Sequence, residues 1–274
     1  MGRSELILDF KERPIEFVVP SDLKVLSLRG CCEWVTDEVL DELASSGCLE
    51  SVYLFRCWRL SDKCLFNLLK RNGLRLRNLE LSGCNHLSDK TLKHVQRFCP
   101  NLKSMDLTRC PLVTDIGLNY VGDGCPELED LLLYADSGLS CSSYSAIAQL
   151  INLRSLDLCG HENLSSQALI SILSTCGKTI EYLNLSWCVN VSDAVLAHVM
   201  DQNLLCSIEY LSIFGIRAFS GQVLSNFLGY LCTHAKKLTR LDVRGIPSVS
   251  EFTENDCRNL RERFPNLVEW KLHH

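Results

Sequence analysis

The sequence predicts a single α/β solenoid, in which short parallel strands alternate with helices. Three observations lead to this fold class. The frame L-x-x-L-x-L, with close variants, starts at residues 23, 49, 76, 102, 128, 153, 180, 208, 238 and 267. A Ser/Thr-Asp pair follows several of these frames, and apolar residues at helical spacing follow the pair. Because a unit of about 26 residues cannot bury its apolar side alone, consecutive units must stack.

Each frame predicts one strand. In LRNLEL, at 76–81, Leu79 and Leu81 point to one face while Asn78, Glu80 and the following Ser82 point to the other. Stacked in parallel, such strands bury their leucines and present the alternate residues on a concave surface. The frames divide the chain into an N-terminal capping segment over 1–22, nine repeats over 23–266 and a terminal half repeat over 267–274.

The second half of each repeat predicts a helix on the convex side. Its first residues are expected to be the Ser/Thr-Asp pairs, namely Thr36-Asp37, Ser61-Asp62, Ser88-Asp89, Thr114-Asp115 and Ser192-Asp193. A hydroxyl here can accept a hydrogen bond from a free N–H of the helix, and the acid favours the positive helix end. Cys99-Pro100 and Cys125-Pro126 predict two helix ends, since proline cannot continue a helix.

Sixteen cysteines would indicate disulfides in a small secreted protein, but this chain has 274 residues and no apolar segment typical of a signal peptide. Five cysteines share the ninth position of their repeats and predict a buried structural ladder: Cys31, Cys57, Cys84, Cys110 and Cys188. A second row at helix ends is expected to include Cys48, Cys99, Cys125 and Cys176, with Cys206 and Cys232 as further candidates. A straight row cannot converge on a tetrahedral metal, so we expect no metal site. His86 and His94 are expected to be ordinary surface histidines.

The pattern L-x-x-L-x-L-x-x-C at this period is the cysteine-containing leucine-rich repeat. Units of the form L-x-x-L-x-L-x-x-C-x-x-[IVL]-[ST]-D resemble those of the F-box/LRR proteins and their relatives, including the yeast antagonist of mitotic exit. The stretch from LLLYADSGLS to FPNLVEWKLH is especially similar to a plant-type F-box/LRR protein, irregular repeats included. The resemblance covers 23–274 and implies a ribonuclease-inhibitor-like horseshoe.

The same resemblance implies a substrate-recognition subunit of a Skp–cullin–F-box ubiquitin ligase. We expect no F-box within these residues, because the first repeat already begins at residue 23. A Skp-type adaptor is therefore an implied partner only if an F-box lies upstream. The alternative is a structural or assembly subunit held by neighbouring subunits of a larger complex, with no ubiquitin role.

Residues three, five, seven and eight of each repeat supply the concave face, which is the expected site of a protein partner. Aromatic residues and arginines, the types that dominate binding energy in protein interfaces, are Tyr53, Phe55, Arg56, Arg109, Tyr134, Tyr182, Trp187, Tyr210 and Phe214. Acidic residues on the same face are Glu80, Asp106, Asp130 and Asp157. The alternative interpretation is that the aromatic side chains only stack on one another across neighbouring strands. In the later repeats, Asp136, His161, Ile216 and Ile246 replace the ladder cysteine.

Other classes of function are disfavoured. Net charge is −5 with Lys and Arg scattered, which argues against nucleic acid, and no apolar run is long enough for membrane insertion. Cys159 and His161 are spaced as a nucleophile and base, but without a third orienting group we expect no catalytic residue and no cofactor. The auxin and jasmonate receptors share this architecture and bind an inositol phosphate, whereas the arginines here alternate with acids. The expected location is cytoplasmic or nuclear, with a complex-bound organellar location left open.

Overall fold

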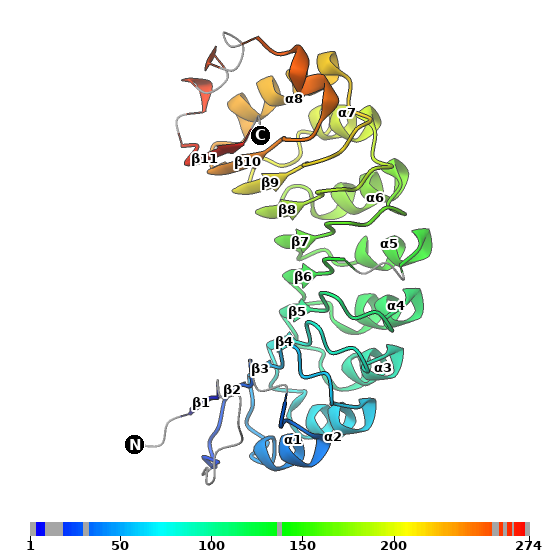
Figure 1. Cartoon of the computed structure of the whole chain (residues 1–274), viewed down its shortest axis with the longest axis vertical. Coiled ribbons are helices and arrows are strands. Elements are labelled where there is room, and N and C mark those ends of the chain that lie inside the picture. Colours follow the sequence, from blue (N-terminus) through cyan, green and yellow to red (C-terminus); the bar gives the residue numbers. More distant parts are fainter. Residues whose placement is uncertain are drawn as a thin grey trace. The chain divides into compact units, whose positions relative to one another are not determined.

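The computed structural model describes residues 4–8, 19–29, 33–135, 139–253, 258–259, 262–264 and 266–271 (Figure 1). The chain forms two compact units, Met1–Gly138 and Leu139–His274.

Unit 1 contains six parallel strands that neighbour one another in chain order: β1 (Glu5–Ile7), β2 (Val25–Ser27), β3 (Ser51–Tyr53), β4 (Asn78–Glu80), β5 (Ser104–Asp106) and β6 (Asp130–Leu132). Its helices are α1 (Asp37–Leu43), α2 (Asp62–Asn72), α3 (Asp89–Phe98) and α4 (Asp115–Gly124). Equivalent frame residues face each other, since Val52 pairs with Leu79 and Leu79 with Met105.

Unit 2 repeats this plan with β7 (Ser155–Asp157), β8 (Tyr182–Asn184), β9 (Tyr210–Ser212), β10 (Arg240–Asp242) and β11 (Glu269–Lys271), again parallel and in chain order. Between them lie α5 (Cys141–Ile147), α6 (Ser166–Cys176), α7 (Asp193–Asp201), α8 (Gly221–His234) and the 3₁₀ helix η1 (Pro247–Glu251).

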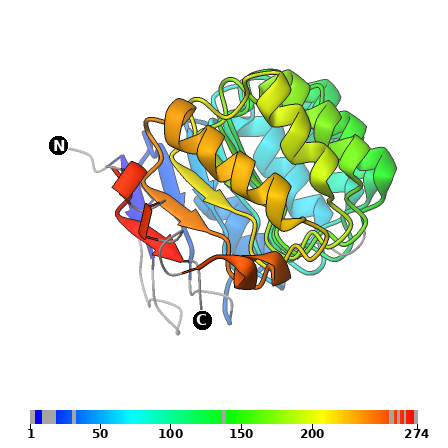
Figure 2. The same cartoon turned by 90° about the horizontal axis from the view of Figure 1, so that it is seen from above.

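In both units the strands form one layer and the helices lie on one side of it (Figures 1 and 2). The core lies between the two layers, where the frame leucines meet the apolar side of each helix. Leu79 and Leu81, for example, are 2% and 0% exposed, and they face the buried Leu92 and Val95 side of the repeat. The predicted α/β solenoid, with parallel strands alternating with helices, is confirmed. No helix in the described part of the chain is long and apolar enough to cross a bilayer.

The Ser/Thr-Asp pairs have a second role that the sequence reasoning missed. Ser88 and Thr114 do cap their own helices, but Thr36, Ser61 and Ser192 form no side-chain cap bond. Instead, an aspartate reaches the next repeat at four junctions. Its carboxylate accepts a hydrogen bond from the backbone N–H of the following cap residue, at 2.8–2.9 Å, in the pairs Asp37–Ser61, Asp62–Ser88, Asp89–Thr114 and Asp193–Ser220. The acid therefore joins consecutive repeats, and we call this contact the aspartate joint.

The structure places four of the five ladder cysteines in equivalent buried positions. Each thiol donates to the carbonyl of the sixth residue of the preceding repeat: Cys57 to Leu28 (3.7 Å), Cys84 to Leu54 (3.1 Å), Cys110 to Leu81 (3.1 Å) and Cys188 to Leu158 (3.1 Å). Cys31 lies outside the described residues. His161, Ile216 and Ile246 fill the same slot in later repeats and are at most 3% exposed.

The second row of cysteines is less regular. Cys99, Cys125, Cys176 and Cys232 are buried, whereas Cys206 is exposed. The chain after α7 turns through left-handed backbone at Asn203 and Leu205, and Leu205 takes the buried place instead. Among the described residues, no group of three or more His, Cys, Asp or Glu side chains is placed to hold a metal ion.

Candidate protein-binding surface

The strand face takes its shape from the eighth residue of each repeat, which turns the chain after the strand. This residue has left-handed backbone in eight successive repeats, with φ of 56° to 84°: Arg56, Gly83, Arg109, Ala135, Gly160, Trp187, Gly215 and Gly245. Glycine adopts this conformation freely, but another residue there costs about 1–2 kcal/mol. Two arginines and a tryptophan therefore stand where the backbone favours glycine.

The fifth residue of the repeat stabilises this turn. An aspartate or asparagine side chain accepts the backbone N–H two residues later in Asp106 (2.8 Å), Asp157 (2.9 Å), Asn184 (3.1 Å) and Asp242 (3.2 Å). Such Asx turns are local structure. Asp106 and Asp157, which the repeat positions place on the predicted binding face, are thus engaged by their own backbone.

In unit 2 the four predicted aromatic residues form two ring pairs across neighbouring repeats, Tyr182 with Tyr210 and Trp187 with Phe214, which we call together the Trp187 cluster. The rings of Tyr182 and Tyr210 stack with centroids 4.4 Å apart and an interplanar angle of 8°. Trp187 and Phe214 meet edge to face at 4.9 Å. The rings do stack across strands, as the alternative interpretation expected, yet Trp187 remains 45% exposed. The cluster therefore keeps apolar surface that the fold does not cover.

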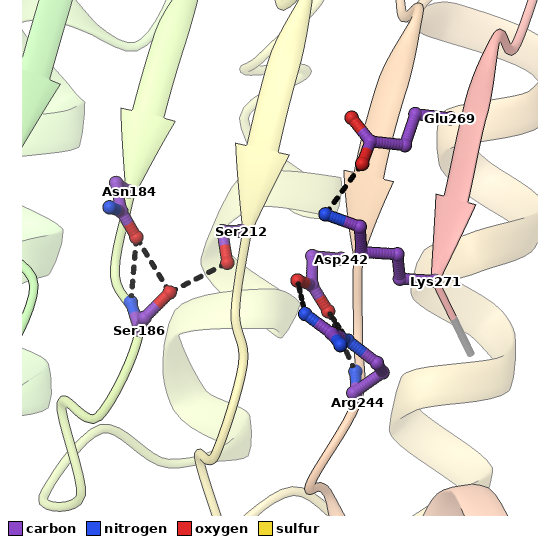
Figure 3. A network of polar contacts seen from close by, with 7 residues as sticks. All are labelled: Asn184, Ser186, Ser212, Asp242, Arg244, Glu269 and Lys271. Atoms are coloured by element: carbon purple, nitrogen blue, oxygen red, sulfur yellow. Dashed lines mark hydrogen bonds and ion pairs between the residues drawn. The ribbon is translucent and has the colours of Figure 1, made fainter. Parts of the chain in front are cut away.

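Two ion pairs lie on or just after β10 and on β11, the strands that follow those of the Trp187 cluster (Figure 3). Asp242 accepts two hydrogen bonds from the Arg244 guanidinium, at 3.0 and 2.8 Å, and Glu269 pairs with Lys271 at 2.5 Å. Arg244 also lies over the Phe214 ring, 5.2 Å from its centroid. Each of these two pairs joins one positive and one negative side chain, so the pairs themselves add no net charge beside the cluster.

Tyr182 is held by a carboxylate at the edge of the cluster. Its hydroxyl donates to Asp157 Oδ2 at 3.4 Å, and Asn184 donates to the same oxygen at 3.0 Å. Burial, with a further contribution from the Asp157 charge, raises the pKa of Tyr182 well above its ordinary value. The phenol is therefore neutral throughout the physiological range and acts as a hydrogen-bond donor.

Unit 1 brings the other predicted residues together as two cation–aromatic pairs. Arg56 lies 5.1 Å from the Phe55 ring centroid, and Arg109 lies 5.3 Å from that of Tyr134. Both aromatic side chains are 36% exposed. The predicted Tyr53 is half-buried beneath Arg29, whose guanidinium pairs with Glu80. A shallow cleft of about 130 Å³ lies there, between Tyr53, Glu80 and Asp106.

The Cys159–His161 pair is poorly suited to nucleophilic chemistry. His161 is 3% exposed, and its Nδ1 lies 3.1 Å from the hydroxyl of the buried Tyr144. Burial, followed by the neighbouring Asp157 charge, raises the pKa of the Cys159 thiol to about 11. A nucleophilic cysteine needs a lowered pKa, because the thiolate is the reactive form. His161 instead occupies the ladder slot.

Sequence reasoning missed the residues that support the aromatic side chains. A Cβ at Gly215 would lie 2.8 Å from Trp187, and one at Gly245 would lie 3.1 Å from Phe214. Arg240, whose guanidinium lies 5.0 Å from the Tyr210 ring centroid, was also overlooked. The signal for the two glycines was the eighth position, which holds glycine in some repeats and a large side chain in others, whereas Arg240 stands at the third position, like Tyr182 and Tyr210.

No known protein-family model matches the sequence. Among solved structures, the chain is similar to Rad7 in the yeast Rad7–Elc1 complex, with a TM-score of 0.60 and 15% identity over 89% of this chain and 67% of that one. An internalin from Listeria monocytogenes, InlF, has a TM-score of 0.51 and 16% identity over 93% and 76% of the two chains. A leucine-rich-repeat protein from Leptospira interrogans gives 0.51 and 17% over 91% and 54%.

The fold is that of a leucine-rich-repeat protein. At these identities the likeness concerns the leucine-rich-repeat fold alone, and the closer resemblance to F-box/LRR proteins stays a prediction. The leucine-rich-repeat fold commonly presents its strand face for protein recognition, by stacking side chains of successive repeats into one extended surface. The residues described above occupy that face.

Proposed function

We propose that this chain is a non-catalytic protein-binding module and that the Trp187 cluster is the centre of its binding surface. One observation carries the proposal: Trp187 is held in left-handed backbone, with φ of 62°, and is nevertheless 45% exposed. A bulky residue in this conformation is uncommon, and strain of this kind concentrates at functional sites. Glycine fills the same position in the repeats before and after it.

The composition of the surface supports the same proposal. Tryptophan, tyrosine and arginine are the residues whose removal costs most in protein interfaces, particularly when they lie at the centre of the contact. The Trp187 cluster offers a tryptophan and two tyrosines, and unit 1 separately carries Arg56 and Arg109 in its own cation–aromatic pairs. Stacking among the rings restricts their motion before binding, which lowers the entropy that association must overcome.

We further propose that the bound protein is the substrate of a Skp–cullin–F-box ubiquitin ligase. The support is the resemblance of the cysteine-containing repeats to those of F-box/LRR proteins. In addition, Rad7 shares the fold and was crystallised as a complex with a second protein, Elc1.

Affinity purification of the tagged full-length protein from its own cells, followed by mass spectrometry, tests both levels of the proposal. The binding variant is Trp187→Ala with Tyr210→Ala. The matched control is Trp58→Ala, which removes a tryptophan of similar exposure, 43%, from a loop. We expect the binding variant to recover a partner in an amount more than about tenfold lower than wild type. Its melting temperature should fall only slightly, through the loss of the Tyr182–Tyr210 stack, and the control should recover the partner as wild type does.

Two outcomes would contradict the proposal at different levels. If the binding variant and the control recover the same partners, the Trp187 cluster is not the binding centre. If the wild-type protein brings down a stoichiometric assembly without a Skp-type adaptor or a cullin, the ligase role is wrong and a structural subunit is favoured instead.

A further inference from the structure

Positive charge on the helices is confined to two neighbours. Of the eight α-helices whose bounds the structure gives, only α2 and α3 contain lysine or arginine: Lys63, Lys70 and Arg71 on α2, and Lys90, Lys93 and Arg97 on α3. The chain as a whole is acidic, with a net charge of −5. A scattered distribution would have placed some of these six cations on other helices.

The carboxylates of α2 and α3 do not neutralise this strip. Asp62 accepts hydrogen bonds from Ser88 and Thr91, and Asp89 accepts from Thr114, so both are engaged in aspartate joints. Lys63, Lys90 and Lys93 are exposed and form no ion pair with any residue that the structure describes. Like charges on adjacent helices disfavour folding slightly, so the fold itself gives no reason for this arrangement.

Aromatic rings occupy the middle of the strip. Phe66 on α2 lies 4.9 Å from His94 and 5.9 Å from Phe98, centroid to centroid, and all three side chains are half-buried. Lys70 covers the Phe66 ring at 5.7 Å and Arg97 covers the Phe98 ring at 5.2 Å. Burial lowers the pKa of His94, so this imidazole is neutral at physiological pH and adds to the apolar centre.

A shallow hollow of about 510 Å³ opens on this surface, lined by Ser61, Asp62, Lys63, Phe66, His86, Lys90 and His94; the Asp62 carboxylate in this lining is the one that accepts hydrogen bonds from Ser88 and Thr91. Lys63 and Lys90 lie in the first turn of their helices, and Lys70 and Arg97 follow seven residues later. At 1.5 Å per residue, this separates the two cationic ends by about 10 Å. The surface thus runs from cations through an apolar centre to cations.

We propose that the α2–α3 surface is a second binding site, which takes a short acidic segment of a partner protein with a large apolar side chain in its middle. The apolar side chain packs against Phe66 and His94, and carboxylates on either side of it pair with Lys63 and Lys90 at one end and with Lys70 and Arg97 at the other. The site lies on the helix side of unit 1 and is independent of the Trp187 cluster.

The neighbouring helices limit what can bind here. α1 carries Asp37, Glu38, Asp41 and Glu42, and α4 carries Asp115 and Asp123, with no cation on either helix. Packed helices lie about 8–10 Å apart, so the basic strip is two helices wide with acid on both sides. A membrane surface or a nucleic-acid duplex extends over that acid, whereas a single peptide segment fits between the acidic helices.

Fluorescence anisotropy with a labelled synthetic peptide, EDEFLEDE, tests the proposal directly. We expect saturable binding that weakens with salt, that falls at least about tenfold when Lys63→Glu and Lys90→Glu are combined, and that is lost with the peptide EDESSEDE. The matched control combines Lys178→Glu with Lys237→Glu, which changes the net charge equally at exposed lysines of unit 2. Trp187→Ala should leave binding of this peptide unchanged.

Three results would overturn the inference. The first is a lack of saturable binding, and the second is an equal loss in the control variant. The third is tighter binding of a single-stranded oligothymidylate or of phosphatidylserine vesicles than of the peptide. Thermal unfolding of both double variants tests whether reduced peptide binding comes from loss of structure. Because all four lysines are exposed, we expect both variants to unfold at the wild-type temperature.

Discussion

The indole ring of Trp187 lies on the backbone of Gly215, so that a Cβ at Gly215 would approach Trp187 Cε3 to 2.8 Å. The same relationship recurs between Arg56 and Gly83, where a Cβ would lie 3.0 Å from the arginine Cγ. In both cases the side chain of one repeat rests on the glycine of the next. Glycine is therefore needed at these two positions for two reasons. It adopts a positive φ without strain, and it leaves room for the side chain of the preceding repeat.

Substituting Gly215→Ala should destabilise the fold and displace Trp187. A non-glycine residue at φ of +74° costs about 1–2 kcal/mol, and the added methyl group meets the indole. We expect a lower free energy of unfolding in urea, together with a change in tryptophan fluorescence. The control is Gly229→Ala in α8, where a Cβ meets nothing within 4 Å. There the helix should gain about 0.5–1 kcal/mol. Equal effects at the two glycines would contradict the structure.

Two replacements of Trp187 distinguish the effect of its backbone conformation on stability from the effect of its side chain on binding. Trp187→Gly and Trp187→Val both remove the indole, but only glycine fits φ of 62° without strain. We expect Trp187→Val to be less stable than Trp187→Gly by about 1–2 kcal/mol, while both lose partner binding equally. Denaturant unfolding measures the first quantity and affinity capture the second. A valine variant as stable as the glycine variant would show that the left-handed turn is unstrained.

The aspartate joint should make the free energy of unfolding depend on pH in the acidic range. Burial acts to raise the pKa of Asp62, but hydrogen bonds from Thr91 and Ser88 together outweigh it, so the folded pKa lies below the ordinary value. A lowered folded pKa means that this group stabilises the protein fully above the unfolded pKa of about 3.9, and that the contribution is lost as pH falls through the folded pKa. We expect Asp62→Asn to cost about 1–2 kcal/mol at pH 7, moderated because the group is partly solvated.

The difference in unfolding free energy between wild type and Asp62→Asn should therefore shrink as the pH is lowered below 4. The matched control is Asp123→Asn, since Asp123 is exposed on α4 and is engaged in no aspartate joint. A pH-independent difference for Asp62→Asn would show that its hydrogen bonds do not depend on the charge.

The rate of thiol alkylation should differ between the buried and the exposed cysteines. Burial raises the pKa of the Cys84 thiol above the ordinary range and those of Cys125 and Cys188 to about 12. Because the thiolate is the reactive species, these residues should resist iodoacetamide at pH 8 in the folded protein. Cys141 and Cys206, which are exposed, should be alkylated. Peptide mass spectrometry reads out each site, and the same reaction in urea, where all should be modified, is the control.

The repeat period was enough to predict most of the fold. Leucines two residues apart, as in Leu79 and Leu81, specify a strand with one buried face, and the regular distance to the next frame specifies parallel stacking. The aspartate joint could not be predicted in this way. The cap position of Asp62 is visible in the sequence, but the distance from its carboxylate to Ser88 depends on how tightly two helices pack.

The candidate surface was predicted in part. Counting positions within the repeat selects Tyr182, Tyr210 and Trp187, because residues at equal positions must lie side by side on parallel strands. The same counting made Asp106 and Asp157 look like binding residues, although they hold their own turns. Whether a polar side chain faces a partner or its own backbone depends on torsion angles, and a residue pattern carries no information about these.

The aspartate joint has a consequence for how the number of repeats can change during evolution. A repeat such as Ser88 to Thr114 carries a hydroxyl residue that receives the preceding acid and an acid that reaches the following hydroxyl residue. Its two ends are therefore compatible with each other as well as with its neighbours. Doubling or deleting one such repeat would leave an acid facing a hydroxyl residue at the new junction, so an array of this kind can change length by one repeat without losing an aspartate joint.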